Sequence, residues 1–99
     1  MSYGYLGSMK THPGRRDEVV AILLKDVEEL RAAGCDRYIV AVAQTDDVTI
    51  WITEVWRSKA DHDASLQLPT VRAAIAAAMP MLTGEFTGHD VSVVGGLGV

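Results

Sequence analysis

The stretch 48–56, VTIWITEVW, constrains the fold more than any other part of this chain of 99 residues. Even-numbered positions carry mostly large apolar side chains and odd-numbered positions face the other way, which is the period of a β-strand. A nearly continuous apolar run, RYIVAVA at 37–43, precedes it across a short polar turn at 45–47. The pair predicts a β-hairpin, and the apolar character of 37–43 favours burial on both of its faces.

Helical patterns flank this hairpin on both sides. Between residues 16 and 33, apolar side chains recur with the spacing of one amphipathic helix, and Gly34 follows as a C-terminal stop. After the hairpin, Ser58 is placed to cap a helix that runs to about residue 68, with Asp61 completing a capping box. Pro69 suits the first position of a further helix, and Pro80 is expected to kink or end it.

Weaker strand patterns cover residues 3–9 and 85–94, which completes the order β-α-β-β-α-β with a broken second helix. This order predicts an α+β, ferredoxin-like domain over residues 1–99, with one antiparallel sheet and helices on one face. The other face of the sheet is then left bare. With 48% hydrophobic residues in so small a chain, we expect a homodimer that packs sheet against sheet.

Composition argues against several classes of partner. The net charge is −4 and there is no block of Lys or Arg, which disfavours nucleic acid and anionic membranes. A single cysteine, Cys35, allows no internal disulfide and fits a reducing cytoplasm. No stretch is long and apolar enough to cross a membrane, the start does not resemble a signal peptide, and no spacing of His, Cys, Asp or Glu indicates a metal site.

Two side chains at the end of the 48–56 strand are candidates for a binding site. Trp56 is either a core residue that closes the strand or a wall on which an aromatic ligand stacks. Glu54 shares its face, where a carboxylate needs a reason to be buried. It could pair with Arg37 or Arg72, remain exposed to solvent, or act as a base at a pocket mouth.

His62 is the candidate catalytic residue. It lies near the start of the helix that follows the strand, where a neutral imidazole could accept a proton from a phenol. The alternatives are a solvent-facing position and a packing contact. Its neighbours Asp61 and Asp63 are interpreted as residues that stabilise the helix start.

Further pocket candidates are less distinctive. Tyr38, like Tyr3 and Tyr5, could line a pocket, although strands favour tyrosine in any case. Arg72 could steer an acidic or phenolate ligand, although such an arginine is more often solvated or paired.

Several of these residues together resemble the antibiotic biosynthesis monooxygenase (ABM) domain family. The resemblance is carried by EVWRS at 54–58, by Ala60-x-His62-Asp63-x-Ser65-Leu66, and by Pro69 and Pro80. It implies a dimeric α/β barrel in which two sheets close on each other. It also implies a substrate pocket between sheet and helices, to which the strand-ending Trp56 and polar residues of the next helix belong.

The resemblance further implies a chemistry. Characterised members oxidise polycyclic phenols or quinols with O₂, often without metal, flavin or haem, so we expect a cofactor-independent monooxygenase acting on a small aromatic polyphenol or quinol. In it His62 is the base, and Trp56, Glu54, Arg72 and Tyr38 bind substrate. Haem-degrading relatives carry a histidine further along this helix, and residues 65–68 have none. The alternative is a non-enzymatic, small-molecule-binding or structural dimer.

Overall fold

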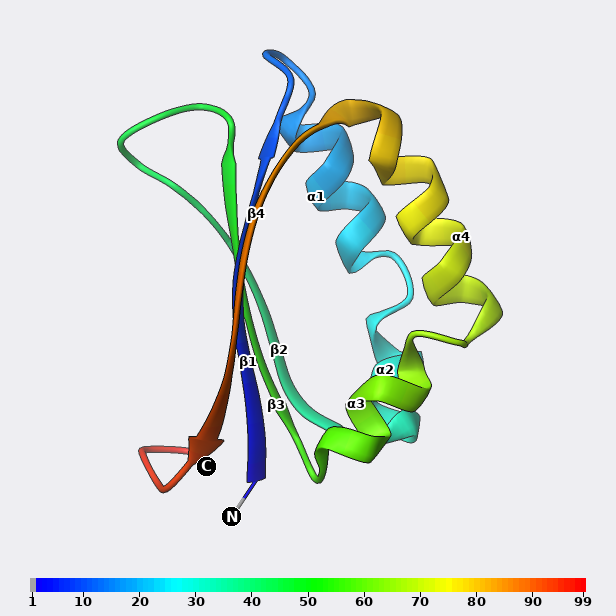
Figure 1. Ribbon diagram of the computed structural model, residues 1–99, viewed down its shortest axis with the longest axis vertical. Helices are drawn as coiled ribbons and strands as arrows, with labels where there is room; N and C mark the ends of the chain where they lie inside the picture. Colours follow the sequence, from blue (N-terminus) through cyan, green and yellow to red (C-terminus); the bar gives the residue numbers. More distant parts are fainter. Residues whose placement is uncertain (1) are drawn as a thin grey trace.

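A single layer of four strands carries all the helices on one of its faces (Figure 1). The computed structural model describes residues 2–99. The antiparallel strands lie in the order β2-β3-β1-β4. Their bounds are β1 Ser2–Thr11, β2 Cys35–Val42, β3 Thr49–Trp56 and β4 Leu82–Val93. The helices are α1 Arg16–Leu24, α2 Val27–Ala33, α3 Lys59–Ser65 and α4 Pro69–Ala78, and a 3₁₀ turn, Met79–Met81, leads into β4.

This arrangement confirms the ferredoxin-like fold and the predicted hairpin. In the hairpin, Val40 lies opposite Ile52 and Val42 opposite Ile50. Ile50, Ile52 and Trp56 face the helices and are buried, as the alternation of the 48–56 stretch predicts. The main core forms where Val19 of α1 packs against Ile50 and Ile52.

Two expectations, about the extent of a helix and the burial of a strand, were wrong. The helical pattern of residues 16–33 forms two helices, because the chain leaves helical geometry at Asp26, which takes the N-cap position of α2. Strand β2 is not buried on both faces. Its outward residues Arg37, Ile39 and Ala41 are exposed, since the helices cover only the inner face of the sheet.

The helix ends follow the local rules. Ser58 caps α3 by accepting a hydrogen bond from the backbone N–H of Asp61, at 3.1 Å. The Asp61 carboxylate does not complete a capping box but pairs with Arg57, at 3.4 Å. Gly34 ends α2 with φ 113°, where a Cβ would also lie 2.6 Å from Oδ2 of Asp61. Only glycine fits both demands at that position.

Candidate functional site

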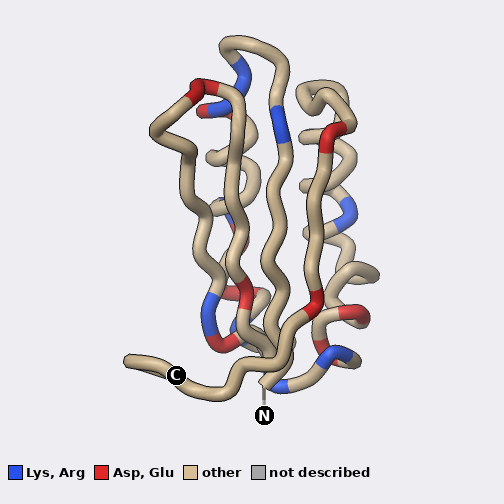
Figure 2. The backbone as a smooth tube through the Cα atoms, turned by 60° about the vertical axis from the view of Figure 1, so that its left-hand side comes forward, with Lys and Arg blue, Asp and Glu red and all other residues tan. Residues whose placement is uncertain are grey.

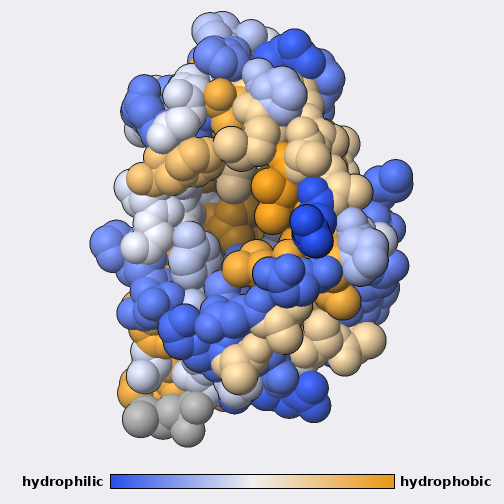
Figure 3. Space-filling model, turned by 45° about the vertical axis from the view of Figure 1, so that its right-hand side comes forward, coloured by the Kyte–Doolittle hydropathy of each residue, from blue (hydrophilic) through white to orange (hydrophobic). Residues whose placement is uncertain are grey.

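A pocket of about 530 Å³ lies between the inner face of the sheet and the helices. Figure 3 shows it as a hollow with mostly hydrophobic walls on the helical side of the molecule. Aliphatic side chains, chiefly from α1, α4 and the strands, supply the largest part of its walls. A smaller set of polar side chains, Tyr5, Tyr38, Glu54 and His62 among them, also lines it. Such a lining is typical of sites for small organic molecules.

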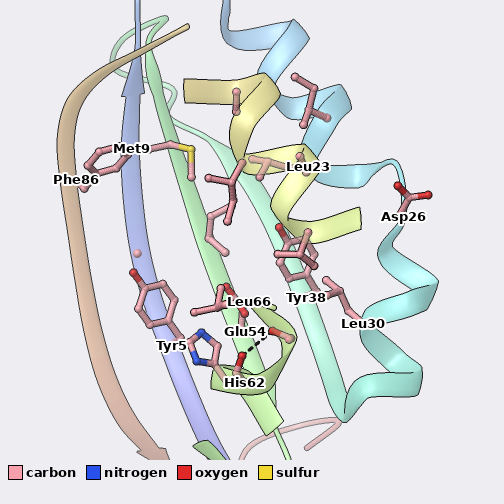
Figure 4. A pocket seen from close by; sticks show the side chains of 18 of the residues that line it. Tyr5, Met9, Leu23, Asp26, Leu30, Tyr38, Glu54, His62, Leu66 and Phe86 are labelled. Carbon is pink, nitrogen blue, oxygen red and sulfur yellow. Dashed lines mark hydrogen bonds between the residues drawn. The ribbon is translucent and has the colours of Figure 1, made fainter. Parts of the chain in front are cut away.

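His62 lies at the sheet side of α3, surrounded by aromatic rings. Its imidazole is stacked on Tyr5 with ring centroids 5.5 Å apart, tilted against Tyr3 at 5.1 Å, and in edge contact with Trp56 at 5.6 Å. Only 13% of the side chain is exposed. Figure 4 shows the imidazole beside Tyr5 in the wall of the pocket. Three strand residues thus hold one helix residue in place.

The two ring nitrogens of His62 differ in their surroundings. Nδ1 lies 3.0 Å from Oδ1 of Asp63, whose carboxylate also bonds Nζ of Lys59 at 3.0 Å. Nε2 has no hydrogen-bond partner among residues 2–99, and it is not among their buried unpartnered atoms. A carboxylate on Nδ1 favours the tautomer in which Nε2 is the free acceptor. Nε2 is therefore available to a ligand.

Glu54 stands between two tyrosines on the inner face of the sheet. Its cross-strand neighbours are Tyr5 on β1 and Tyr38 on β2. Its Oε1 accepts a hydrogen bond from Nε1–H of Trp56 at 2.8 Å. Burial raises the pKa of Glu54, and the hydrogen bond from Trp56 and, when His62 is protonated, the imidazolium charge oppose that rise. No arginine pairs with this carboxylate among the described residues.

Trp56 is a core residue that also borders the pocket. It is 1% exposed and packs with Leu30 and Cys35 in a second apolar cluster. The same burial raises the pKa of the Cys35 thiol to about 11. Tyr38 packs against this cluster, and burial, followed by the charge of Glu54, raises the pKa of its phenol. Both Trp56 and Tyr38 line the pocket.

Tyr5 lies over a patch of sheet that has no side chains. Gly7 and Gly88 are paired across β1 and β4, and a Cβ at Gly88 would come within 2.4 Å of the Tyr5 hydroxyl oxygen. A Cβ at Gly7 would lie 2.8 Å from the Tyr5 ring. The two glycines therefore make room for the ring that stacks on His62.

Arg72 is not brought to the pocket. It is exposed on α4, and among residues 2–99 the lining includes its neighbours Thr70 and Val71 but not Arg72 itself. The structure thus gathers His62, Trp56, Glu54 and Tyr38 around one cavity and leaves Arg72 outside. Sequence reasoning missed the contact of Asp63 with His62. The two glycines beneath the Tyr5 ring were also missed, although Gly7 falls on the same strand face as Tyr5, which is a signal for a patch without side chains.

Residues 2–99 form neither a cluster of metal ligands nor a helix that could cross a membrane. No group of three or more His, Cys, Asp or Glu side chains is placed to hold a metal ion. Within the same range, every helix is too short or too polar to span a membrane.

Fold and pocket define a class of small ferredoxin-like domains with an aromatic, mostly apolar cavity between sheet and helices. Residues 3–77 match the family described as antibiotic biosynthesis monooxygenase. The chain belongs to this family. No match is found among curated proteins.

Solved structures agree with this assignment. A crystal structure from Chloroflexus aurantiacus J-10-fl, which carries the same family description, is 42% identical, covers 97% of this chain and 96% of its own, and superposes with a TM-score of 0.86. A Caulobacter crescentus CB15 protein is 20% identical, with coverage of 95% and 91% and a TM-score of 0.85. A Nitrosomonas europaea protein is 10% identical, with coverage of 94% and 90% and a TM-score of 0.87. The last two show the shared fold alone.

Proposed function

We propose that this protein is a cofactor-independent monooxygenase that oxidises a small aromatic phenol or quinol with O₂. The observation that carries the proposal is the setting of His62. Its ring is fixed by Tyr3, Tyr5 and Trp56, one ring nitrogen is bonded to Asp63, and the other is free at the wall of an apolar pocket. A general base needs this combination of fixed orientation and a free acceptor atom.

In the proposed reaction, Nε2 of His62 removes the proton of a phenolic hydroxyl. The phenolate then gives one electron to O₂, and the resulting radical pair joins at a ring carbon that carries hydrogen, forming a peroxide that takes the proton back from His62. Loss of water breaks the O–O bond and leaves one oxygen atom as a new carbonyl. The aliphatic walls keep bulk water from the intermediates. The test is O₂ uptake by pure protein on a panel of hydroquinones, against heat-inactivated protein.

Asp63 is the proposed positioning residue for this base. We expect Asp63→Asn to lower kcat/KM about tenfold, because an amide holds Nδ1 of His62 in place less firmly than a carboxylate does. Asp61→Asn is the matched control, since Asp61 pairs with Arg57 and not with His62. An equal loss of kcat/KM in both variants would show that Asp63 acts only through the stability of α3.

The sheet face opposite the helices supports a further part of the proposal, a homodimer. Four large apolar side chains on this face are left partly exposed: Leu6, Ile39, Trp51 and Val91. Figure 2 shows charged residues toward the ends of the strands, with the middle of the sheet largely free of them. A patch of this kind on a small domain is typical of an interface, and we propose that a second copy covers it, sheet against sheet.

Trp51→Glu is expected to give a monomer at micromolar concentration, because it places a charge in the middle of the proposed interface. Trp51 is 51% exposed, so the folded chain itself tolerates the change. Leu24→Glu is the control, since Leu24 is a similarly exposed apolar residue on α1, away from this face. Sedimentation equilibrium measures the mass of each variant. A wild type that sediments as a monomer contradicts the dimer.

A further inference from the structure

The ionisable side chains in the pocket are acidic apart from His62 and the tyrosines. Glu54 stands in its interior, and Asp26 lies at its edge where α1 gives way to α2 (Figure 4). In the described part of the chain, no Lys or Arg lines the cavity. A pocket that recognises carboxylate or phosphate groups normally supplies such a cation.

Two cations close to the His62 end of the pocket are held outside it. Lys59 lies over the ring of Tyr3, 5.9 Å from its centroid, and bonds to Asp63 at 3.0 Å. Arg57 pairs with Asp61 at 3.4 Å on the surface. Neither residue lines the cavity. An anionic ligand that entered would therefore meet the Glu54 carboxylate without a compensating charge.

Glu54 also keeps one oxygen atom for a ligand. Oε1 is bonded to Trp56, whereas Oε2 has no hydrogen-bond partner among residues 2–99 and is not among their buried unpartnered atoms. An ionised carboxylate accepts hydrogen bonds and cannot donate them, so Oε2 suits a hydroxyl donor. The same charge repels an acid.

We infer that Glu54 makes this pocket selective for uncharged aromatic compounds that carry hydroxyl groups, and that it excludes aromatic acids of the same size. This rests on the proposed function only in using the same pocket. It is compatible with a phenolate formed during the reaction, because that anion arises together with an imidazolium at His62. A carboxylate that enters already charged brings no such partner.

The test compares two redox-stable ligands of equal ring size, 2-naphthol and 2-naphthoate, by isothermal titration calorimetry at pH 7.5. Wild-type protein is expected to bind the uncharged naphthol at least tenfold more tightly than the anionic naphthoate. In Glu54→Gln, which keeps the shape and can still accept from Trp56, naphthoate affinity is expected to rise on the order of tenfold. Asp36→Asn makes the same change in net charge at an exposed site outside the pocket and should keep the wild-type preference.

Three results would overturn the inference: equal binding of both ligands to wild type, a preference that survives Glu54→Gln, or binding of neither ligand. Circular dichroism melting confirms that each variant is folded. Because no oxidation is involved, the outcome is separate from that of the proposed function. A protein that prefers naphthol but consumes no O₂ supports the selectivity and contradicts the proposed monooxygenase activity. A protein that oxidises aromatic acids as fast as uncharged quinols supports the monooxygenase activity and contradicts the selectivity.

Discussion

His62→Ala is expected to lower the rate of O₂ uptake on an accepted hydroquinone by about 10²–10⁴-fold, the range that one general base contributes. The expectation follows from geometry, since His62 offers the pocket a free Nε2 while Asp63 holds the other nitrogen. Glu54 is the rival base, because its Oε2 also has no hydrogen-bond partner among residues 2–99. Oxygen-electrode rates at saturating substrate measure the effect.

The control for His62→Ala is His12→Ala, which removes an exposed imidazole from the loop between β1 and α1 and should leave the rate unchanged. Added imidazole separates a base from a packing residue, because a small base can enter the space that His62 leaves between three aromatic rings. Recovery of rate with imidazole concentration indicates lost chemistry. A His62→Ala protein as fast as wild type would show that another group takes the proton.

Sequence patterns were sufficient for the element order, because strand alternation and turn chemistry are local. The alternation of residues 48–56 places Ile50, Ile52 and Trp56 on one face without any knowledge of the sheet. The break at Asp26 was not visible, since apolar residues continue at helical spacing on both sides of it. Exposure of the outer face of β2 depends on where the helices lie, which is a property of the whole fold.

The candidate site, too, could be predicted from the sequence only in part. The proximity of Trp56, Glu54 and His62 could be predicted, because a strand end and the first turn of the next helix are close in space. The contact between His62 and Asp63 could not, since adjacent residues on a helix do not normally face each other and side-chain rotation decides it. The position of Arg72 outside the pocket likewise depends on how α4 is rotated on the sheet.

Trp56→Ala is expected to have the largest effect on stability, a loss of about 3–5 kcal/mol in the free energy of unfolding. Trp56 is 1% exposed and packs with Leu30 and Cys35, so truncation leaves a cavity where α2 meets the sheet. It also removes the N–H that bonds Glu54 and leaves that buried carboxylate with one partner fewer. Domains of this size are stable by only about 5–15 kcal/mol. Urea denaturation followed by circular dichroism measures the loss.

Two further variants separate the contributions to that loss. Trp56→Phe keeps an aromatic ring but removes the hydrogen bond to Glu54, so its loss should fall between wild type and Trp56→Ala. Phe86→Ala truncates an aromatic ring that also lines the pocket but is 51% exposed, and it should cost less than about 1 kcal/mol. If Trp56→Ala proved no more destabilising than Phe86→Ala, Trp56 would only line the cavity and would not be the residue that packs β3 against α2.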